Sequence, residues 1–389
     1  MRRALTLLLG AGAVLLAPTA QGAPHAISPH VIVSAHRGRS AYAPENTMTA
    51  FRNAVRLGAD QLETDTQLTS DGHLVLIHDD TLDRTTSCTG TVQSRPLAQL
   101  EACDAGWWWT PGQGVTDVAA TAPHPLRGTG IRVPEAHELL DYVRSLGAGD
   151  THTISIEIKD QPGEANFDPT GTATAQVLVP LIEASGLKDR TIVQSFWPAA
   201  LTVVKAMDHS IKTQLLTVFA TTPYLAYAIA NGDEIIAPDS TQPDFTSTFV
   251  AAAHAAGKLV IPYTPDTAAD LTATAVTGVD GEITNFPACL LDLEGRARPV
   301  QLLPATSLAA GSGPVAACQG GPLTPLPAKA PTPAPSPAAQ IPEPLPRPPA
   351  LAAPGRGLAA TGLDRRFAGG ALLLSVVGLG LMRRRRCDA

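Results

Sequence analysis

Short apolar runs alternate with longer stretches of helical periodicity between about residues 29 and 300. Such runs are typical of buried parallel strands, and the stretches between them are typical of connecting helices. Eight strand–helix alternations over about 250 residues favour a (β/α)8 TIM barrel. The strands are predicted at Val31–Ser34, Gln61–Asp65, Thr153–Ile158, Thr191–Ser195, Thr213–Thr217, Glu234–Ala237, Lys258–Pro262 and Gly281–Thr284.

Two helices and one hairpin can be predicted more closely. One helix is expected over Asn46–Leu57, and another over Pro134–Leu146, with a proline in its first turn. The Asp-Gly step within Thr69–Gly72 predicts a hairpin that joins Glu63–Leu68 to Leu74–His78. The second arm should therefore run antiparallel to the barrel strands.

Residues of about 85–130 lack clear periodicity, and we interpret them as a small subdomain inserted over the barrel mouth. This insert contains three adjacent tryptophans, Trp107–Trp109. They can line a pocket for an apolar or sugar-like leaving group, or form a hydrophobic lid packed on a disulfide.

The N-terminus predicts export. Residues 1–23 combine a basic start, an apolar run and a small-residue exit, the pattern of a secretory signal peptide. Export implies an oxidising compartment. The five cysteines are Cys88, Cys103, Cys289, Cys318 and Cys387, and the last lies beyond a C-terminal apolar segment. The spacing of the other four favours the disulfides Cys88–Cys103 and Cys289–Cys318.

The C-terminal part of the chain has its own organisation. The barrel (29–300) is followed by an extension (301–321), a Pro/Ala-rich spacer (322–357) and a terminal segment (358–389). The terminal segment holds Leu-Ala-Ala-Thr-Gly, an apolar stretch at 367–382 and a basic tail, an order that resembles the sorting signal of Gram-positive surface proteins.

The sorting-signal resemblance implies that a sortase cuts between Thr361 and Gly362 and joins Thr361 to peptidoglycan. A plain membrane anchor is the alternative, and in that case the apolar stretch stays in the membrane. Either way, the predicted barrel is expected outside a Gram-positive-type cell. A formal net charge of -7 argues against a nucleic-acid partner.

Carboxylates gather where the predicted strands end. Glu63 and Asp65 are two residues apart on one strand, so their side chains share a face, and Glu157 can join them from the next strand. Three converging carboxylates would repel one another without a cation. Ligation by oxygen alone suits Ca²⁺ or Mg²⁺.

Basic side chains follow the same strand ends. His36 and His78 are candidates for proton transfer, because histidine titrates near neutral pH. Arg37 can hold a phosphate oxygen through its planar fork. Lys159 can balance the carboxylates or contact the phosphate. Glu45 is expected in the mouth, where it orients a histidine or the metal ligands.

Together these motifs resemble the glycerophosphodiester phosphodiesterase family over roughly residues 31–290. The motifs are His36–Gly38, Pro44–Thr47, Glu63–Asp65, Thr69–Gly72, His78–Asp79, Leu82–Thr86, Glu157–Lys159, Asp280–Gly281 and Thr284–Pro287. The resemblance implies a phosphodiesterase TIM barrel that splits a glycerophosphodiester into glycerol 3-phosphate and an alcohol.

The resemblance also implies roles for individual residues. Glu63, Asp65 and Glu157 would bind Ca²⁺ or Mg²⁺, and His36 and His78 would act as general base and general acid. Arg37 and Lys159 would steady the phosphate. Which histidine has which role stays open, as does the choice between a neighbouring hydroxyl and water as nucleophile.

Two positions depart from the family motifs. Members often carry Trp-Thr-x-Asn near the end of the seventh strand, where this chain has Tyr263–Asp266, and Asn285 stands where Asp is common. Three other functions remain open: phospholipase C- or D-like cleavage on the same barrel, a non-catalytic wall-displayed binding module, and a carboxylate-pair glycosidase. The flanking histidines and arginine fit phosphate better than sugar.

Overall fold

A computed structural model describes residues 31–38, 41, 43–110 and 124–296. Within these residues one sheet runs in the order β8-β7-β6-β5-β4-β2-β1-β9, and every pairing along this path is parallel. Its strands are β1 (Ile32–Ala35), β2 (Gln61–Leu68), β4 (Thr153–Ile158), β5 (Thr191–Ser195), β6 (Lys212–Thr217), β7 (Ile235–Pro238), β8 (Leu259–Val260) and β9 (Gly281–Thr284).

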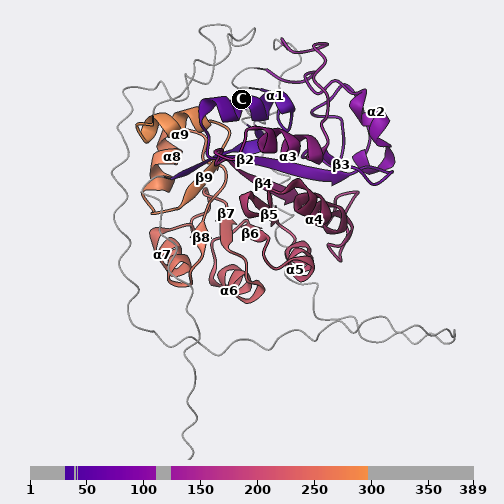
Figure 1. The fold of residues 1–389 in the computed structure, drawn as a ribbon. Coiled ribbons are helices and arrows are strands. Elements are labelled where there is room, and N and C mark those ends of the chain that lie inside the picture. The colour runs from indigo at the N-terminus through magenta and orange to yellow at the C-terminus, as the bar shows by residue number, and fades with distance from the viewer. Residues whose placement is uncertain (1–30, 39–40, 42, 111–123, 297–389) are drawn as a thin grey trace, which may run out of the picture. The chain divides into compact units, whose positions relative to one another are not determined.

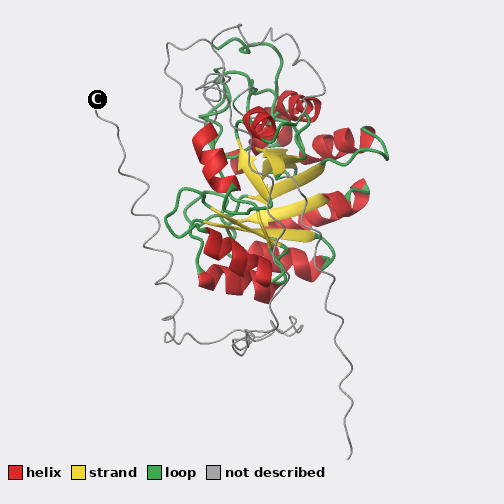
Figure 2. Ribbon diagram, turned by 90° about the vertical axis from the view of Figure 1, so that its left-hand side faces the viewer, coloured by secondary structure: helices red, strands yellow, loops and turns green. Residues whose placement is uncertain are grey.

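The two ends of this sheet meet, so that it nearly closes into a barrel. Tyr263, just beyond β8, forms parallel bridges to Asp239 and Ile283. The backbone N–H of Ile283 donates to the carbonyl of Pro262 at 2.9 Å. Figure 1 shows the strands as a ring with helices around it, and Figure 2 shows the same layers from the side. The predicted (β/α)8 barrel is confirmed.

Helices cover the outside of the ring. They are α1 (Met48–Leu57), α3 (Ala136–Ser145), α4 (Ala173–Ser185), α5 (Pro198–Met207), α6 (Thr222–Asn231), α7 (Ser247–Ala255), α8 (Ala268–Ala275) and α9 (Pro287–Leu293). The main apolar cluster joins strand residues such as Leu62 and Ile154 to helix residues such as Phe51 and Leu139, all fully buried. Burial of apolar surface between the layers therefore holds the barrel together.

Capping residues set the starts of two helices later than the sequence indicates. The helix expected from Asn46 begins at Met48, because Thr47 is extended and its hydroxyl accepts the N–H of Ala50 at 3.3 Å. The helix expected from Pro134 begins at Ala136, since Glu135 forms a capping box with the third helical residue.

The hairpin is confirmed, and the insert packs on it. Strand β3 (Leu74–Leu76) runs antiparallel to β2, and short helix α2 (Leu97–Glu101) lies in the insert. An apolar cluster joins Val75 on β3 to Leu100 and Cys103 of the insert. The predicted Cys88–Cys103 disulfide is present, with an S–S distance of 2.03 Å. The insert is thus held to the hairpin arm by apolar packing and cross-linked internally by the disulfide.

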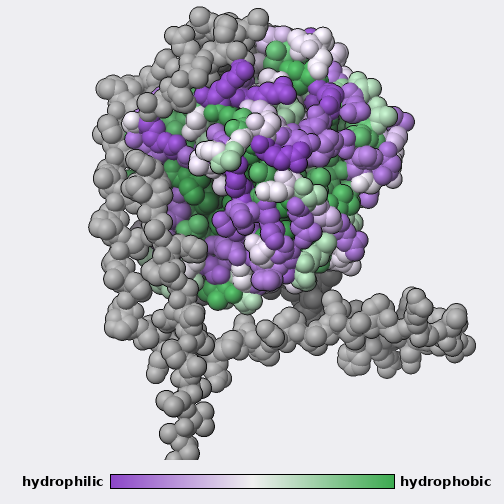
Figure 3. Space-filling model, in the orientation of Figure 1, coloured by the Kyte–Doolittle hydropathy of each residue, from purple (hydrophilic) through white to green (hydrophobic). Residues whose placement is uncertain are grey.

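Some predictions concern residues outside the described part of the chain. Cys289 is disulfide-bonded, but its predicted partner Cys318 lies outside the described residues. The signal peptide, the spacer and the sorting signal also lie outside them. Within the described ranges, no helix has both the length and the apolar character needed to cross a membrane. The surface in Figure 3 mixes polar and apolar patches over the described residues.

One buried carboxylate has no hydrogen-bond partner among the described residues. Glu282 on β9 is 0% exposed, and neither of its carboxylate oxygens has a hydrogen-bond partner there. Burial, followed by the negative charge of Glu294, raises the pKa of Glu282 well above its ordinary value. The folded chain therefore favours the protonated acid at a pH where the unfolded chain ionises it.

We predict that Glu282→Gln stabilises the protein at pH 7 and not at pH 4. The pKa of Glu282 is raised in the folded state. The wild-type free energy of unfolding is therefore highest below the pKa of Glu282 in the unfolded chain, and it falls as the pH rises from there toward the folded pKa. The difference between the two proteins should grow by up to about 1.4 kcal/mol per pH unit above pH ~4.3. Denaturant unfolding at several pH values measures it.

The exposed Glu183 on α4 provides the matched control. Glu183→Gln should change the free energy of unfolding by the same small amount at both pH values. A Glu282→Gln difference that is equally large at pH 4 and pH 7 would contradict the prediction.

Candidate active site

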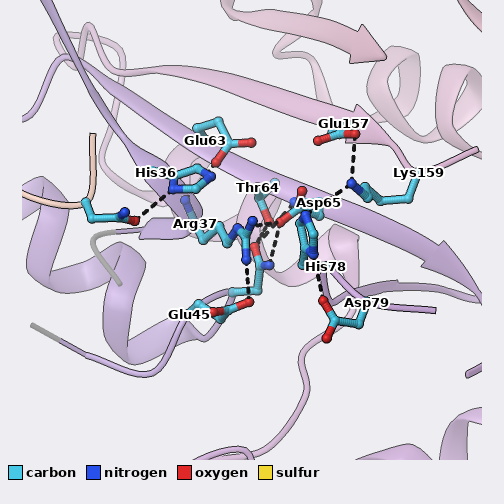
Figure 4. Close-up of polar contacts among 12 residues, drawn as sticks. His36, Arg37, Glu45, Glu63, Thr64, Asp65, His78, Asp79, Glu157 and Lys159 are labelled. Carbon is cyan, nitrogen blue, oxygen red and sulfur yellow. Dashed lines mark hydrogen bonds and ion pairs between the residues drawn. The ribbon is translucent and has the colours of Figure 1, made fainter. Parts of the chain in front are cut away.

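Three carboxylates converge from the middle of β2 and the carboxyl end of β4. Glu63 and Asp65 share a face of β2, and the strand register pairs Asp65 with Glu157 on β4. One oxygen from each lies within 4.8 Å of the others, and all three side chains are buried. The carboxylates that the sequence singled out are therefore brought together (Figure 4).

Neutral donors orient these carboxylates. The Arg37 backbone N–H donates to Glu63 Oε2, and Gln194 Nε2 donates to Glu63 Oε1, both at 2.7 Å. Asn46 Nδ2 donates to Asp65 Oδ2 at 2.7 Å. The helix expected over Asn46–Leu57 does not include Asn46, because the Asn46 backbone is left-handed (φ 55°) and its side chain binds the cluster.

The electrostatics of this cluster suit a divalent cation. Burial and then the charge of Asp65 raise the pKa of Glu63 well above its usual range. Burial, opposed by Lys159 and supported by Asp65, raises the pKa of Glu157 to about 8. A cation that binds all three carboxylates would offset both the desolvation and the repulsion. The residues present therefore fit a divalent cation.

A tight turn after β1 places Arg37 over the cluster. Arg37 has a left-handed backbone (φ 51°) and Gly38 follows at φ 74°. A Cβ on Gly38 would lie 2.6 Å from the ring of Phe51, so only glycine fits there. The Arg37 side chain donates to Glu45 at 2.8 Å, and its Nε lies 3.5 Å from Asp65.

His78 lies on the Lys159 side of the cluster (Figure 4). Its Nδ1 is 2.7 Å from Asp79 Oδ1, and its Nε2 is 3.1 Å from the Lys159 ammonium. A carboxylate accepts and an ammonium donates, so Nδ1 carries the proton. Burial and the charges of Arg37 and Lys159 lower the pKa of His78. Lys159 also lies 3.1 Å from Glu157, so it balances the carboxylates.

His36 lies on the Glu63 side of the cluster. Its Nδ1 is 2.7 Å from Asn285 Oδ1, and Asn285 donates through Nδ2 to Asp266 at 2.6 Å. Desolvation, followed by the positive charge of Arg37, lowers the pKa of His36 to about 3. Both candidate histidines are therefore neutral in this arrangement, and each is held through Nδ1.

A network of charged pairs extends from Arg37 to His78. Glu45 accepts from Arg37 and Arg84, and Arg84 also makes two hydrogen bonds to Asp79, which holds His78. These pairings lower the pKa of Glu45 to about 2 against the opposing effect of burial. Arg84 thus links the candidate phosphate-binding arginine to one candidate histidine.

The insert touches this network. The Arg84 guanidinium lies 5.8 Å from the centre of the Trp108 ring, within range of a cation–π interaction. Trp108 and Trp109 are buried, whereas Trp107 is 44% exposed. Two of the three tryptophans therefore pack inside the protein, one of them against a charged group beside the site.

Sequence reasoning gave no roles to several residues that orient this site. They are Asp79, Arg84, Gln194, Asp266 and Asn285. The order His-Asp followed by Asp-Arg was visible as a motif, but its pairings were not. Glu45 was expected to orient a histidine or metal ligands, and the structure places it between Arg37 and Arg84, which contact Asp65 and Asp79.

Comparison with known proteins matches this chain to one family. Residues 36–289 match the model of the glycerophosphoryl diester phosphodiesterase family. The chain is 32% identical over 267 residues to a glycerophosphodiester phosphodiesterase of Caldanaerobacter subterraneus, covering 67% of this chain and 97% of that one. It is 30% identical over 266 residues to one of Bacillus subtilis, covering 66% of this chain and 84% of that one.

Solved structures show the same fold. A glycerophosphoryl diester phosphodiesterase from Silicibacter pomeroyi superposes with a TM-score of 0.58 at 24% identity, covering 69% of this chain and 95% of that one. A phosphodiesterase from Oleispira antarctica, in complex with sn-glycerol-3-phosphate, gives 0.56 at 23% identity, covering 68% and 96%.

We predict that Arg84→Met destabilises the protein by roughly 1.5–3 kcal/mol, the range for lost hydrogen bonds to charged groups. The loss leaves Asp79 and Glu45 without a shared partner. Arg84→Lys should recover only part of it, because one ammonium cannot bind both carboxylates in the plane of the guanidinium. Chemical denaturation measures each change.

Arg144→Met is the matched control, since Arg144 is 56% exposed and pairs with Asp141 on the surface of α3. It should cost at most about 0.5 kcal/mol. Equal losses for Arg84→Met and Arg144→Met would show that the network adds nothing to stability.

Proposed function

Because the chain belongs to the glycerophosphoryl diester phosphodiesterase family, a family of phosphoric diester hydrolases, we propose that it hydrolyses glycerophosphodiesters with one divalent cation, outside the cell. The observation that carries the proposal is the buried cluster of Glu63, Asp65 and Glu157 with a histidine on either side. The products would be glycerol 3-phosphate and an alcohol.

Each residue has a task in this reaction. Ca²⁺ or Mg²⁺, held by the three carboxylates, would supply neutralisation of the charge that develops on the phosphate. Arg37 and Lys159 are placed to bind phosphate oxygens, because both lie beside the cluster as buried cations. They would orient the diester and exclude alternative poses.

The two histidines would move the protons. Each ring is held through Nδ1, so Nε2 is the atom that would exchange protons, and in His78 that atom accepts from Lys159 until substrate binds. One histidine would take a proton from the nucleophile at Nε2. The other would have to enter the reaction already protonated at Nε2, so that it can give this proton to the leaving alcohol. A cyclic phosphate among the products would identify a neighbouring glycerol hydroxyl as the nucleophile, and its absence in a single turnover would identify water.

We predict that the purified full-length chain releases glycerol 3-phosphate from glycerophosphocholine, that EDTA abolishes release and that Ca²⁺ or Mg²⁺ restores it. His36→Ala and His78→Ala should each lower kcat by about 10²–10⁴-fold, the usual contribution of a general acid or base. An enzyme-coupled assay of glycerol 3-phosphate measures both effects.

His73→Ala is the control, because His73 is 45% exposed and contacts Glu135 away from the cluster. It should keep wild-type activity. Isothermal titration with each ion separates binding from turnover: Asp65→Asn should weaken binding, whereas Asp141→Asn on the surface of α3 should not. Full activity in EDTA would refute the metal dependence, and full activity of both histidine variants would refute the proton-transfer roles.

The proposed location rests on two sequence motifs and one disulfide. The signal-peptide pattern of residues 1–23 and the ordered sorting motif, apolar stretch and basic tail of 358–389 support export followed by attachment to peptidoglycan by a sortase. The Cys88–Cys103 disulfide agrees with an oxidising compartment. The substrate would therefore be a diester that is available at the cell surface.

We predict that wall digests of a sortase-containing host yield a peptide that ends at Thr361 and is linked to a peptidoglycan fragment, as mass spectrometry can detect. Thr361→Ala should move the protein to the membrane fraction, because the uncut apolar stretch at 367–382 is retained. Recovery of an intact C-terminus from wild-type cells would favour the plain membrane anchor.

A further inference from the structure

Asp266 is connected to His36 through the side chain of one intervening residue, Asn285. The Asn285 side chain accepts from His36 Nδ1 through Oδ1 at 2.7 Å and donates to Asp266 Oδ2 through Nδ2 at 2.6 Å. The other Asp266 oxygen, Oδ1, accepts the backbone N–H of Asn285 at 2.9 Å and the hydroxyl of Thr284 at 3.2 Å. Each oxygen of the carboxylate thus faces a donor.

This arrangement determines which way the amide points. A carboxylate only accepts hydrogen bonds, so the NH₂ group of Asn285 must face Asp266 and its oxygen must face His36. A flipped amide would place its oxygen 2.6 Å from a carboxylate oxygen. The imidazole must then donate from Nδ1, which leaves its lone pair on Nε2.

We propose that Asp266 is a positioning residue that acts through Asn285 to hold His36 in the tautomer whose lone pair is on Nε2. The proposal rests on the proposed function, because it deepens the role of His36 in the same site. Both Asp266 and Asn285 stand where the sequence departs from the family motifs, and the structure brings the two departures into contact.

His78 offers a contrast within the same site. Its Nδ1 faces the carboxylate of Asp79 directly, whereas the Nδ1 of His36 faces a neutral amide. An amide can be turned around and a carboxylate cannot, so only the His36 side needs a second residue to fix the tautomer. Asp266 meets that need without placing a charge against His36.

Exchanging the two residues gives a sharp test. In Asp266→Asn, the new NH₂ group must face either the NH₂ or the backbone N–H of Asn285. The first clash is relieved only if Asn285 turns and forces the proton of His36 onto Nε2. In Asn285→Asp, two carboxylates face each other at the 2.6 Å contact. The double variant, Asp266→Asn with Asn285→Asp, exchanges the amide and the carboxylate. Its new amide can donate to the new carboxylate and still accept from Thr284 and the backbone, so every hydrogen bond can re-form.

We expect each single variant to lower kcat on glycerophosphocholine by about 10²–10⁴-fold, the contribution of one general acid or base, with KM changed by less than about threefold. The double variant should return to within about tenfold of the wild-type kcat. Asp270→Asn, an exposed substitution on α8 near the site, is the control and should keep full activity.

Nitrogen-15 NMR of the histidine rings in the full chain reports the tautomer independently of turnover. Wild type and the double variant should show His36 with a protonated Nδ1, and Asp266→Asn should show the proton on Nε2. The signal is assigned by its loss in His36→Ala. An unchanged tautomer in Asp266→Asn would overturn the proposal, as would a double variant no more active than either single variant.

The two readouts separate failure of this inference from failure of the proposed function. If wild type does not hydrolyse the diester but the tautomer switches as expected, the positioning role of Asp266 is supported and the proposed activity is refuted. If wild type is active and the tautomer does not respond to Asp266→Asn, the activity holds and Asp266 has no positioning role.

Discussion

The site depends on the cost of burying three like charges at one end of a barrel. Glu63, Asp65 and Glu157 are all nearly inaccessible to water, where repulsion between carboxylates is strong. The surroundings offset that cost with the cations Arg37 and Lys159 and with two amide donors, Asn46 before α1 and Gln194 on β5. A divalent cation would neutralise the negative charge that remains on the cluster.

Barrel closure supplies the second half of the site. The register of β1 against β9 pairs Ala35 with Thr284, so the residues that follow them, His36 and Asn285, leave the sheet side by side. They are 249 positions apart in the chain and 2.7 Å apart in space. The other histidine, His78, is positioned by a local structure, which consists of the hairpin arm and the insert that packs on it. The two proton-transfer candidates are thus positioned by independent parts of the fold.

The sequence predicted the barrel and the carboxylate cluster because both follow from local periodicity. Residues two apart on a strand share a face, so Glu63 and Asp65 could be paired without coordinates. The pairings of Arg84 and Asp266 could not be found in this way. Arg84 binds Glu45 from 39 positions away, and Asp266 is 19 positions from Asn285, so neither contact has a fixed period. Such contacts depend on loop paths.

Glu282 shows why a shifted pKa alone does not identify a site. Burial raises the pKa of Glu282 as it raises that of Glu63, and both side chains are hidden from water. Only Glu63 has oriented donors and further carboxylates within reach of a common ion. A pKa shift caused by desolvation shows that burying the charged group makes folding less favourable. It becomes evidence for chemistry only where several groups converge on one point that a substrate or cation can occupy.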